Sequence, residues 1–258
     1  HLDSTTAFWQ AVPANARRWL DDLEIHAVLP STNSYLLEAA NPHGKAVIAL
    51  TQTQGRGRAG RDWVSPAGNL HLSLAWHYAR LPAAWSALSL ACGVALAEHF
   101  QTWHVPCHLK WPNDLLVRGA KLGGILLESR IQGQAATVVL GVGLNRMPGV
   151  WPGATDLHSL GINIPLPILA GQVLGVLLEV CRAYPETGFA PYQRRWWALD
   201  AYAGLPVTLH TPQGTIQGLH VGIGGSGALR LQQPEGVTEF HLGDLSLRPG
   251  THHGRLAV

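Results

Sequence analysis

The sequence predicts an α+β protein in which helices flank a mixed, largely antiparallel sheet, followed by a small β-barrel. Residues 70–78 alternate in side-chain direction as a strand with one face in the core does. Residues 84–103 carry apolar side chains at helical spacing instead. From residue 205 onward the sequence changes to short β runs with Gly-rich turns. We therefore expect one domain over residues 1–203 and a second over residues 204–258.

Composition limits the classes of function. The 258 residues, 47% of them hydrophobic, are enough for one large domain or one large and one small. A net charge of +2 is too small to indicate a nucleic-acid or membrane surface. No apolar stretch is expected to reach the length that spans a bilayer, and no signal-peptide pattern is visible. We therefore expect no membrane partner.

The three cysteines (Cys92, Cys107 and Cys181) are odd in number and widely spaced. This argues against a disulfide framework and favours a reducing, cytoplasmic compartment. Cys92 and Cys181 lie in apolar helical patterns, which predicts core thiols rather than nucleophiles. The histidines show no H-E-x-x-H grouping, so we expect no structural zinc.

The first third of the chain contains short elements. Residues 14–23 are predicted to be helical and residues 25–29 to form a strand. Ser31 or Thr32 is a natural N-cap for a helix over residues 34–40. On propensity alone, Ser31, Thr32 and Asn33 are explained by this cap.

A loop rich in glycine and arginine, residues 52–61, follows a predicted strand over residues 46–52. Glycines let the backbone approach a ligand closely, and guanidinium groups bind phosphate or carboxylate oxygens. The loop therefore predicts an anion site, with a nucleotide as the natural candidate. It matches neither a Walker A loop nor a dinucleotide-binding loop. A solvated surface loop and a disordered RNA-binding segment remain alternatives, although RNA-binding tracts are long and repetitive.

The middle of the chain predicts antiparallel hairpins. Short connections join the next strands, too short for the crossovers that parallel pairing requires. The last strand ends in Gly141-Val142-Gly143-Leu144-Asn145, whose glycines are typical of close backbone approach. The predicted strands cover residues 108–114, 115–117, 121–129 and 136–144.

The remaining elements complete the prediction. Residues 165–183 and 191–202 are predicted to be helices. The predicted C-terminal strands cover residues 207–210, 216–223, 228–232 and 238–242.

Five motifs in order make the chain resemble the biotin protein ligases. They are Ser31-Thr32-Asn33, residues 55–61 (GRGRAGR), residues 110–114 (KWPND), residues 121–126 (KLGGIL) and residues 141–145 (GVGLN). The resemblance implies a class II synthetase-like catalytic domain and an SH3-like C-terminal domain. It also implies a two-step reaction that consumes ATP with Mg²⁺. Biotin is activated as biotinyl-5′-AMP and is then transferred to one lysine of a biotin carboxyl carrier domain, with acetyl-CoA carboxylase the expected source.

The resemblance also assigns roles to residues. The catalytic residues would be Lys121, Arg58 and Asp114, and we hypothesise that Asp114 helps to deprotonate the incoming lysine. Donors and acceptors suit the neutral urea of biotin, while cations suit its carboxylate and the phosphates. The biotin-binding set is Ser31, Thr32, Asn33, Gln52, Gly55, Arg56, Gly57, Arg58, Lys121, Gly124 and Gly143. The ATP and adenylate set is Arg56, Arg58, Arg61, Trp63, Lys110, Asn113, Lys121 and Asn145, with no metal ligand assigned.

The chain departs from the family pattern at three points. Pro30 stands where an acidic residue is common, and Gln54 replaces the usual alanine. The second tryptophan near the adenine falls at Ala154 by spacing, with Trp151 close enough to substitute.

Some family members carry an N-terminal helix-turn-helix domain, and about thirty residues before Ser31 are too few for one. We therefore expect a monofunctional ligase that binds no operator DNA. Edge strands would allow a homodimer.

Two rival functions remain. A lipoate–protein ligase or octanoyltransferase would share the fold and an equivalently placed lysine. A non-catalytic biotin sensor, or an interaction module built on the SH3-like domain, would need neither Arg58 nor Lys121.

Overall fold

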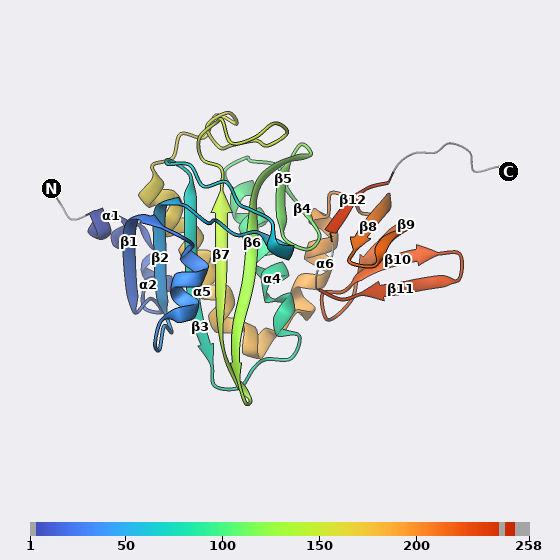
Figure 1. Cartoon of the computed structure of the whole chain (residues 1–258), viewed down its shortest axis with the longest axis horizontal. Coiled ribbons are helices and arrows are strands. Elements are labelled where there is room, and N and C mark those ends of the chain that lie inside the picture. Colours follow the sequence, from blue (N-terminus) through green and yellow to red (C-terminus); the bar gives the residue numbers. More distant parts are fainter. Residues whose placement is uncertain (1–3, 243–245, 251–258) are drawn as a thin grey trace.

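The protein is described by a computed structural model that covers residues 4–242 and 246–250. A seven-stranded sheet has the order β1-β2-β3-β7-β6-β5-β4 (Figure 1). Only the β1–β2 pair is parallel, which confirms the mixed, largely antiparallel sheet and its hairpins. The strands are β1 (Asp22–Leu29), β2 (Lys45–Gln52), β3 (Leu70–Tyr78), β4 (Cys107–Lys110), β5 (Asp114–Val117), β6 (Ala120–Gln132) and β7 (Ala135–Leu144).

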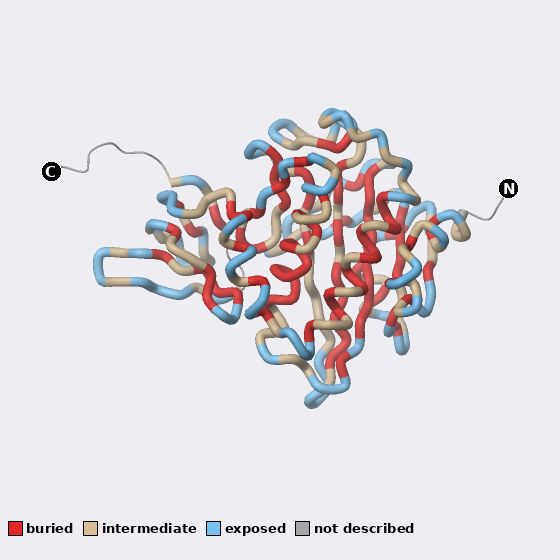
Figure 2. Tube along the Cα trace, turned by 180° about the vertical axis from the view of Figure 1, so that it is seen from behind, coloured by how far each residue is buried: buried red, intermediate tan, exposed pale blue. Residues whose placement is uncertain are grey.

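Helices cover both faces of this sheet. In Figure 1, α3 (Thr32–Glu38) lies in front of the sheet and the two longest helices lie behind it. Seen from behind, these helices and the central strands form the buried centre of the molecule (Figure 2). The remaining helices are α1 (Ser4–Ala11), α2 (Ala14–Arg17), α4 (Leu88–Gln101), α5 (Leu166–Thr187) and α6 (Ala190–Leu199).

Strand β3 differs from the expectation of a single buried face. Leu70, Leu72 and Leu74 belong to the main hydrophobic core, as their alternation predicts. His71 and Ser73 on the other face are also buried, at 2% and 0% exposure. Helix α3 contacts β3 and covers much of this second face. The polar side chains of this face are therefore buried between the sheet and α3.

Helix α5 corrects a second expectation. Its 22 residues contain a window of mean hydropathy 1.6, so one helix is long and apolar enough to cross a membrane by length and composition. Within this fold, however, α5 packs against α1, α4 and β3. Its buried side includes Leu174, Leu178 and Cys181, with Cys181 at 0% exposure. An apolar core helix accounts for this composition, and Cys92 is buried beside it as predicted.

The chain ends in a five-stranded antiparallel sheet of order β11-β10-β9-β8-β12. It is an SH3-like unit, as the Gly-rich β runs predict. The last of its strands, β12, was not predicted. The strands are β8 (Pro206–Thr211), β9 (Gly214–Ile223), β10 (Leu229–Gln233), β11 (Gly236–Phe240) and β12 (Ser246–Pro249).

Buried polar contacts fix the C-terminal sheet against the larger one. The Trp111 indole donates to the Gly227 carbonyl at 3.0 Å. His220 on β9 bonds through Nε2 to Asp200, the residue that ends α6, and both side chains are fully buried. Trp196 also donates its indole N–H to Asp200, at 3.2 Å. The position of β12 relative to the larger sheet therefore depends on this polar junction.

Candidate active site

Glycines on β6 and β7 open a hollow on the sheet face that carries α3. A Cβ atom at Gly141 would lie 2.4 Å from Asn33 Oδ1, and one at Gly143 would lie 2.5 Å from ring carbons of Trp63. Real Cβ atoms do not approach other atoms this closely, so each position requires glycine. The two glycines thus let the Asn33 and Trp63 side chains lie directly on the sheet backbone.

Uncharged polar groups form one end of the hollow. Ser31 Oγ accepts from the Ser34 N–H at 3.3 Å, which confirms Ser31 as the N-cap of α3. The Thr32 N–H donates to Gln52 Oε1 at 2.8 Å. Asn33 Oδ1 accepts from Ser73 Oγ at 2.6 Å. Ser31, Thr32 and Asn33 are all buried, so they form a preorganised set of donors and acceptors.

The Gly/Arg loop is held in a compact form at the edge of the hollow. The Gly57 N–H donates to the Arg61 carbonyl at 2.7 Å, and the Trp63 N–H donates to the Gly55 carbonyl at 2.9 Å. Ala59 and Gly60 adopt positive φ values of 54° and 70°. A Cβ at Gly55 would meet the Trp63 carbonyl oxygen at 2.3 Å, so Gly55 permits this close return of the chain.

Three charged side chains form the opposite end of the hollow. Asp114 Oδ1 lies 2.9 Å from Lys121 Nζ, and Asp114 Oδ2 lies 3.3 Å from Lys110 Nζ. The register of the hairpin brings them together, since Asp114 pairs with Gly124 across a β-bulge in β5–β6. Lys121 Nζ also lies 5.1 Å from the centre of the Trp63 ring.

Burial and charge shift the pKa values at this end. Burial raises the pKa of the Asp114 carboxyl, but the charges and hydrogen bonds of Lys121 and Lys110 outweigh it and hold the pKa below its usual value. Burial lowers the pKa of the Lys110 ammonium. Asp114 opposes this effect, whereas the positive charges of Arg248 and Lys121 add to it. This end of the hollow therefore carries more positive than negative charge.

These features line one hollow that opens to solvent at its mouth. Most predicted site residues line it: Ser31, Thr32, Asn33, Gln52, Arg56, Gly57, Arg58, Arg61, Trp63, Lys110, Asn113, Asp114, Lys121, Gly124 and Gly143.

Two predicted residues do not reach the cavity wall. Gly55 is a buried residue of the loop itself, where it lets the chain return close to the Trp63 carbonyl. Asn145 is 1% exposed, and its side-chain amide donates to the carbonyls of Lys121 and Thr155. Asn145 therefore fixes the loop after β7. Its expected place at the nucleotide stays a prediction.

The wall also contains residues that the sequence did not single out. His71 lines it, and no described residue bonds its buried Nε2. Burial lowers the pKa of His71. Ser246, Leu247 and Arg248 reach it from β12. No motif in the sequence assigned His71 or the three β12 residues to this site.

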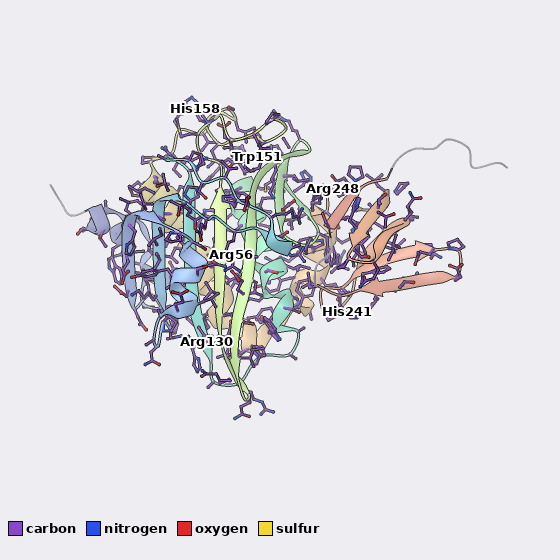
Figure 3. All side chains as sticks on the ribbon, in the orientation of Figure 1. Arg56, Arg130, Trp151, His158, His241 and Arg248 are labelled. Carbon is purple, nitrogen blue, oxygen red and sulfur yellow. The ribbon has the colours of Figure 1, made fainter. Side chains whose placement is uncertain are left out.

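Trp151, a candidate for the second tryptophan, stands beside the cavity. Its ring meets that of Trp63 edge to face, with centres 5.6 Å apart. Figure 3 labels Trp151, Arg56 and Arg248, which come from three separate segments of the chain. Of these, Arg56 and Arg248 line the cavity. Within residues 4–242 and 246–250, no group of three or more His, Cys, Asp or Glu side chains is placed to hold a metal ion.

The fold and the cavity define a class of α+β protein that holds a partly neutral, partly anionic small molecule beneath an Arg/Gly-rich loop. Residues 25–145 match the Biotin/lipoate A/B protein ligase family, and residues 203–248 match the Biotin protein ligase C terminal domain. The chain belongs to the biotin protein ligase family.

Individual proteins show the same similarity. The chain is 37% identical to the Escherichia coli (strain K12) protein named bifunctional ligase/repressor BirA, over 91% of this chain and 78% of that protein. It is 36% identical to the biotin–[acetyl-CoA-carboxylase] ligase of Paracoccus denitrificans, over 80% of this chain and 92% of that protein. The solved structure of the biotin protein ligase from Aquifex aeolicus in complex with biotin and ATP superposes with a TM-score of 0.75 at 28% identity, covering 90% of this chain and 100% of that one.

Proposed function

We propose that this protein is a biotin–[acetyl-CoA-carboxylase] ligase that makes biotinyl-5′-AMP from biotin and ATP and transfers the biotinyl group to a carrier lysine. One observation carries the assignment. A single cavity joins uncharged, preorganised polar groups at Thr32 and Gln52 to a cluster of cations at Lys110 and Lys121. Biotin has this same polarity, with a neutral urea at one end and a carboxylate at the other.

Biotin would lie with its urea against the start of α3. Ser31, Thr32 and Gln52 offer oxygen atoms and N–H groups to a neutral urea. Asn33 would contact biotin through its oxygen alone. Both hydrogens of its amide nitrogen are already used, by the Leu126 carbonyl at 3.3 Å and by Glu128 at 3.0 Å. Asn33 therefore positions the neighbouring groups, and only its oxygen can still accept from a ligand.

The first step needs positioning and charge stabilisation rather than a protein nucleophile. A biotin carboxylate oxygen attacks the α-phosphorus of ATP, and the bond to the β-phosphate oxygen breaks to release pyrophosphate. Lys121, Arg58 and Lys110 stand where negative charge would accumulate. Mg²⁺ would neutralise phosphate charge. Since both oxygens of Asp114 already pair with lysines, we infer that phosphates and water hold most of the metal's coordination sites.

In the second step, the neutral amine of the carrier's lysine attacks the acyl carbon, the C–O bond to AMP breaks, and the amine's surplus proton passes to solvent. The expectation that Asp114 removes the amine's proton is not supported by its surroundings. A carboxylate whose pKa is held below its usual value, with both oxygens on ammonium groups, is a weak base. We assign Asp114 instead to keeping Lys110 and Lys121 charged and in place.

An Asp114→Asn variant tests this assignment. Asp114 raises the pKa of Lys110 against the effect of burial, so its removal lowers that pKa further. Lys110 then loses its charge at a lower pH. We expect adenylate formation to fall about tenfold at neutral pH and the alkaline limb of its pH profile to move to lower pH. The control is Asp22→Asn, which removes a carboxylate paired with Lys45 instead. An unshifted profile would contradict the assignment.

Gly143→Ala tests the place of Trp63, which we assign to stacking on the adenine. The new methyl group would lie 2.5 Å from the Trp63 ring and must displace it. Since stacking on a base contributes about 1–3 kcal/mol, we expect the KM for ATP to rise about tenfold. Gly222→Ala in β9 is the control, because its nearest neighbour is Arg230 Cδ at 3.8 Å. An unchanged KM for ATP would remove Trp63 from the nucleotide site.

The proposal also covers the domain boundary, the cellular compartment and the partners of the protein. The family match that begins at residue 203 and the sheet that begins at Pro206 support a domain boundary at 203/204. Three free, buried cysteines are consistent with a reducing, cytoplasmic compartment. Strand β1 at the sheet edge would allow a homodimer. The expectations of no operator DNA and no membrane partner stay predictions, which gel-shift and vesicle-flotation assays would test.

Intact-mass analysis of a biotin carboxyl carrier domain tests the proposed function. Incubation with the protein, biotin and MgATP should add one biotinyl group, and omitting ATP should prevent the gain. No gain would contradict the proposal. Modification of a lipoate carrier domain in parallel would then identify a lipoate ligase. If neither carrier domain gained mass, a non-catalytic binder would be favoured.

A further inference from the structure

Glu128 on β6 is a carboxylate that connects two parts of the site. Its Oε2 accepts from the Arg56 guanidinium at 2.7 Å, and its Oε1 accepts from the Asn33 amide at 3.0 Å. Arg56 belongs to the Gly/Arg loop, whereas Asn33 belongs to the first turn of α3. The two segments are more than twenty residues apart in sequence, and Glu128 lies a further seventy residues along. Glu128 is not itself in the cavity wall.

The contact reaches the floor of the cavity through Asn33. Asn33 Oδ1 accepts from Ser73 Oγ, whose oxygen also lies 2.7 Å from Thr32 Oγ1. Thr32 in turn bonds Gln52 through its N–H. A continuous set of hydrogen bonds thus runs from the polar end of the cavity, through Asn33 and Glu128, to the loop.

Arg56 makes the matching contact on the loop side. Its second guanidinium nitrogen donates to Ser34 Oγ at 3.0 Å, so the group bridges β6 and α3. Figure 3 shows Arg56 in front of the central strands of the sheet. Because these partners are all protein groups, the position of the loop can be measured without any substrate.

We propose that Glu128 is a positioning residue that holds the Gly/Arg loop over the cavity by joining Arg56 to Asn33. It touches no substrate, and its effect on catalysis rests on the proposed function. The carboxylate is what makes the connection possible. It accepts two hydrogen bonds from two donors, whereas a glutamine has one oxygen and would turn its amide N–H groups toward the other donor. Glu128→Gln therefore breaks one of the two links.

The size of the effect follows from the exposure of the pair. Arg56 is 46% exposed and Glu128 is 20% exposed, so solvent screens part of their attraction. Charge-assisted hydrogen bonds in such settings change equilibria by about five- to tenfold. The loop should therefore open about five to ten times more often in the variant.

Limited trypsin digestion without ligands tests the loop directly. Cleavage after Arg58, followed by mass spectrometry, should be about five to ten times faster in Glu128→Gln than in the wild type. Arg56→Gln also removes the bond to Ser34, so its cleavage should be about twofold faster still. The double variant should match Arg56→Gln, because the contact between Arg56 and Glu128 is already lost there. The control Glu98→Gln removes an Arg195 ion pair elsewhere and should digest as the wild type does. Wild-type cleavage in Glu128→Gln, or additive single effects, would overturn the proposal.

Ser34→Ala provides a further digestion variant in case Glu128→Gln does not fold. It removes only the second acceptor of Arg56 and should speed cleavage after Arg58 about twofold. If Glu128→Gln cannot be purified, Arg56→Gln replaces it, because it removes the same contact from the loop side. Unchanged cleavage after Arg58 in Arg56→Gln would then overturn the proposal, and cleavage faster than in Ser34→Ala supports it.

A second readout uses biotinyl-5′-AMP supplied to the enzyme with a carrier domain. Glu128→Gln should raise the KM for the adenylate about five- to tenfold while kcat stays within about twofold of the wild type. A merely structural defect would lower the active fraction and hence kcat, with KM unchanged, and would overturn the proposal. If the wild type transfers nothing, the proposed function fails, and the trypsin experiment still decides the role of Glu128.

Discussion

Lys121→Gln should lower the rate of biotinyl-adenylate formation by about 10²- to 10³-fold. Lys121 Nζ lies between the Asp114 carboxylate at 2.9 Å and the Trp63 ring at 5.1 Å, and it faces the cavity. Its side chain is 30% exposed, so part of its charge acts in a site with little water. A fixed positive charge at the position where the carboxylate and the α-phosphate meet stabilises the transition state more than the separate substrates.

The chain offers a closely matched control lysine. Lys45 also pairs with carboxylates, Asp22 and Glu24, and its Nζ lies 5.8 Å from the centre of the Tyr35 ring. It is 21% exposed but does not line the cavity. Lys45→Gln should leave adenylate formation unchanged, as followed by the pyrophosphate released in a single turnover. Equal losses in the two variants would mean that Lys121 acts through general stability rather than through its place in the site.

His220→Ala should lower the free energy of unfolding by about 3–5 kcal/mol. The change leaves the Asp200 carboxylate fully buried without its imidazole partner, although Trp196 and the Tyr202 N–H still donate to it. A buried charge that loses its partner keeps its desolvation penalty and loses the compensating attraction. Urea titration followed by tryptophan fluorescence measures the change.

Two further variants separate this buried pair from a general effect of mutation. Arg195→Ala breaks an ion pair with Glu98, but side chains 43% and 38% exposed contribute about 1 kcal/mol or less. The double change Asp200→Asn with His220→Leu replaces both partners with uncharged side chains and should recover part of the loss. If His220→Ala destabilises no more than Arg195→Ala, the junction between the two sheets does not depend on this pair.

The fold was predictable where local patterns decide it. Ser31 was identifiable as a helix cap because capping involves only neighbouring residues. The hairpins from β5 to β7 followed from connections too short for crossovers. Periodicity also gave the type of α4 and α5 but not their ends, which depend on packing with the rest of the fold.

The site was predictable mainly through its motifs, and less so where long-range register decides. Asp114 meets Lys121 across the β5–β6 pair, whose register shifts between Leu115 and Leu116. Arg248 reaches the cavity from a strand that the sequence did not reveal. Asn145 adjoins a glycine motif in sequence, but its amide nitrogen donates to the carbonyls of Lys121 and Thr155. Glu128 gave no signal at all, since its partners lie on a distant helix and loop.

Biotin-dependent exchange of labelled pyrophosphate into ATP, measured without any carrier domain, tests the central claim most directly. If this cavity activates biotin's carboxylate on the α-phosphorus, the wild type should exchange label only when biotin is present, and Lys121→Gln should reduce the exchange while Lys45→Gln does not. The claim would be contradicted if label exchanged equally well without biotin. It would also be contradicted if a folded wild-type protein supplied with biotin and MgATP showed no exchange.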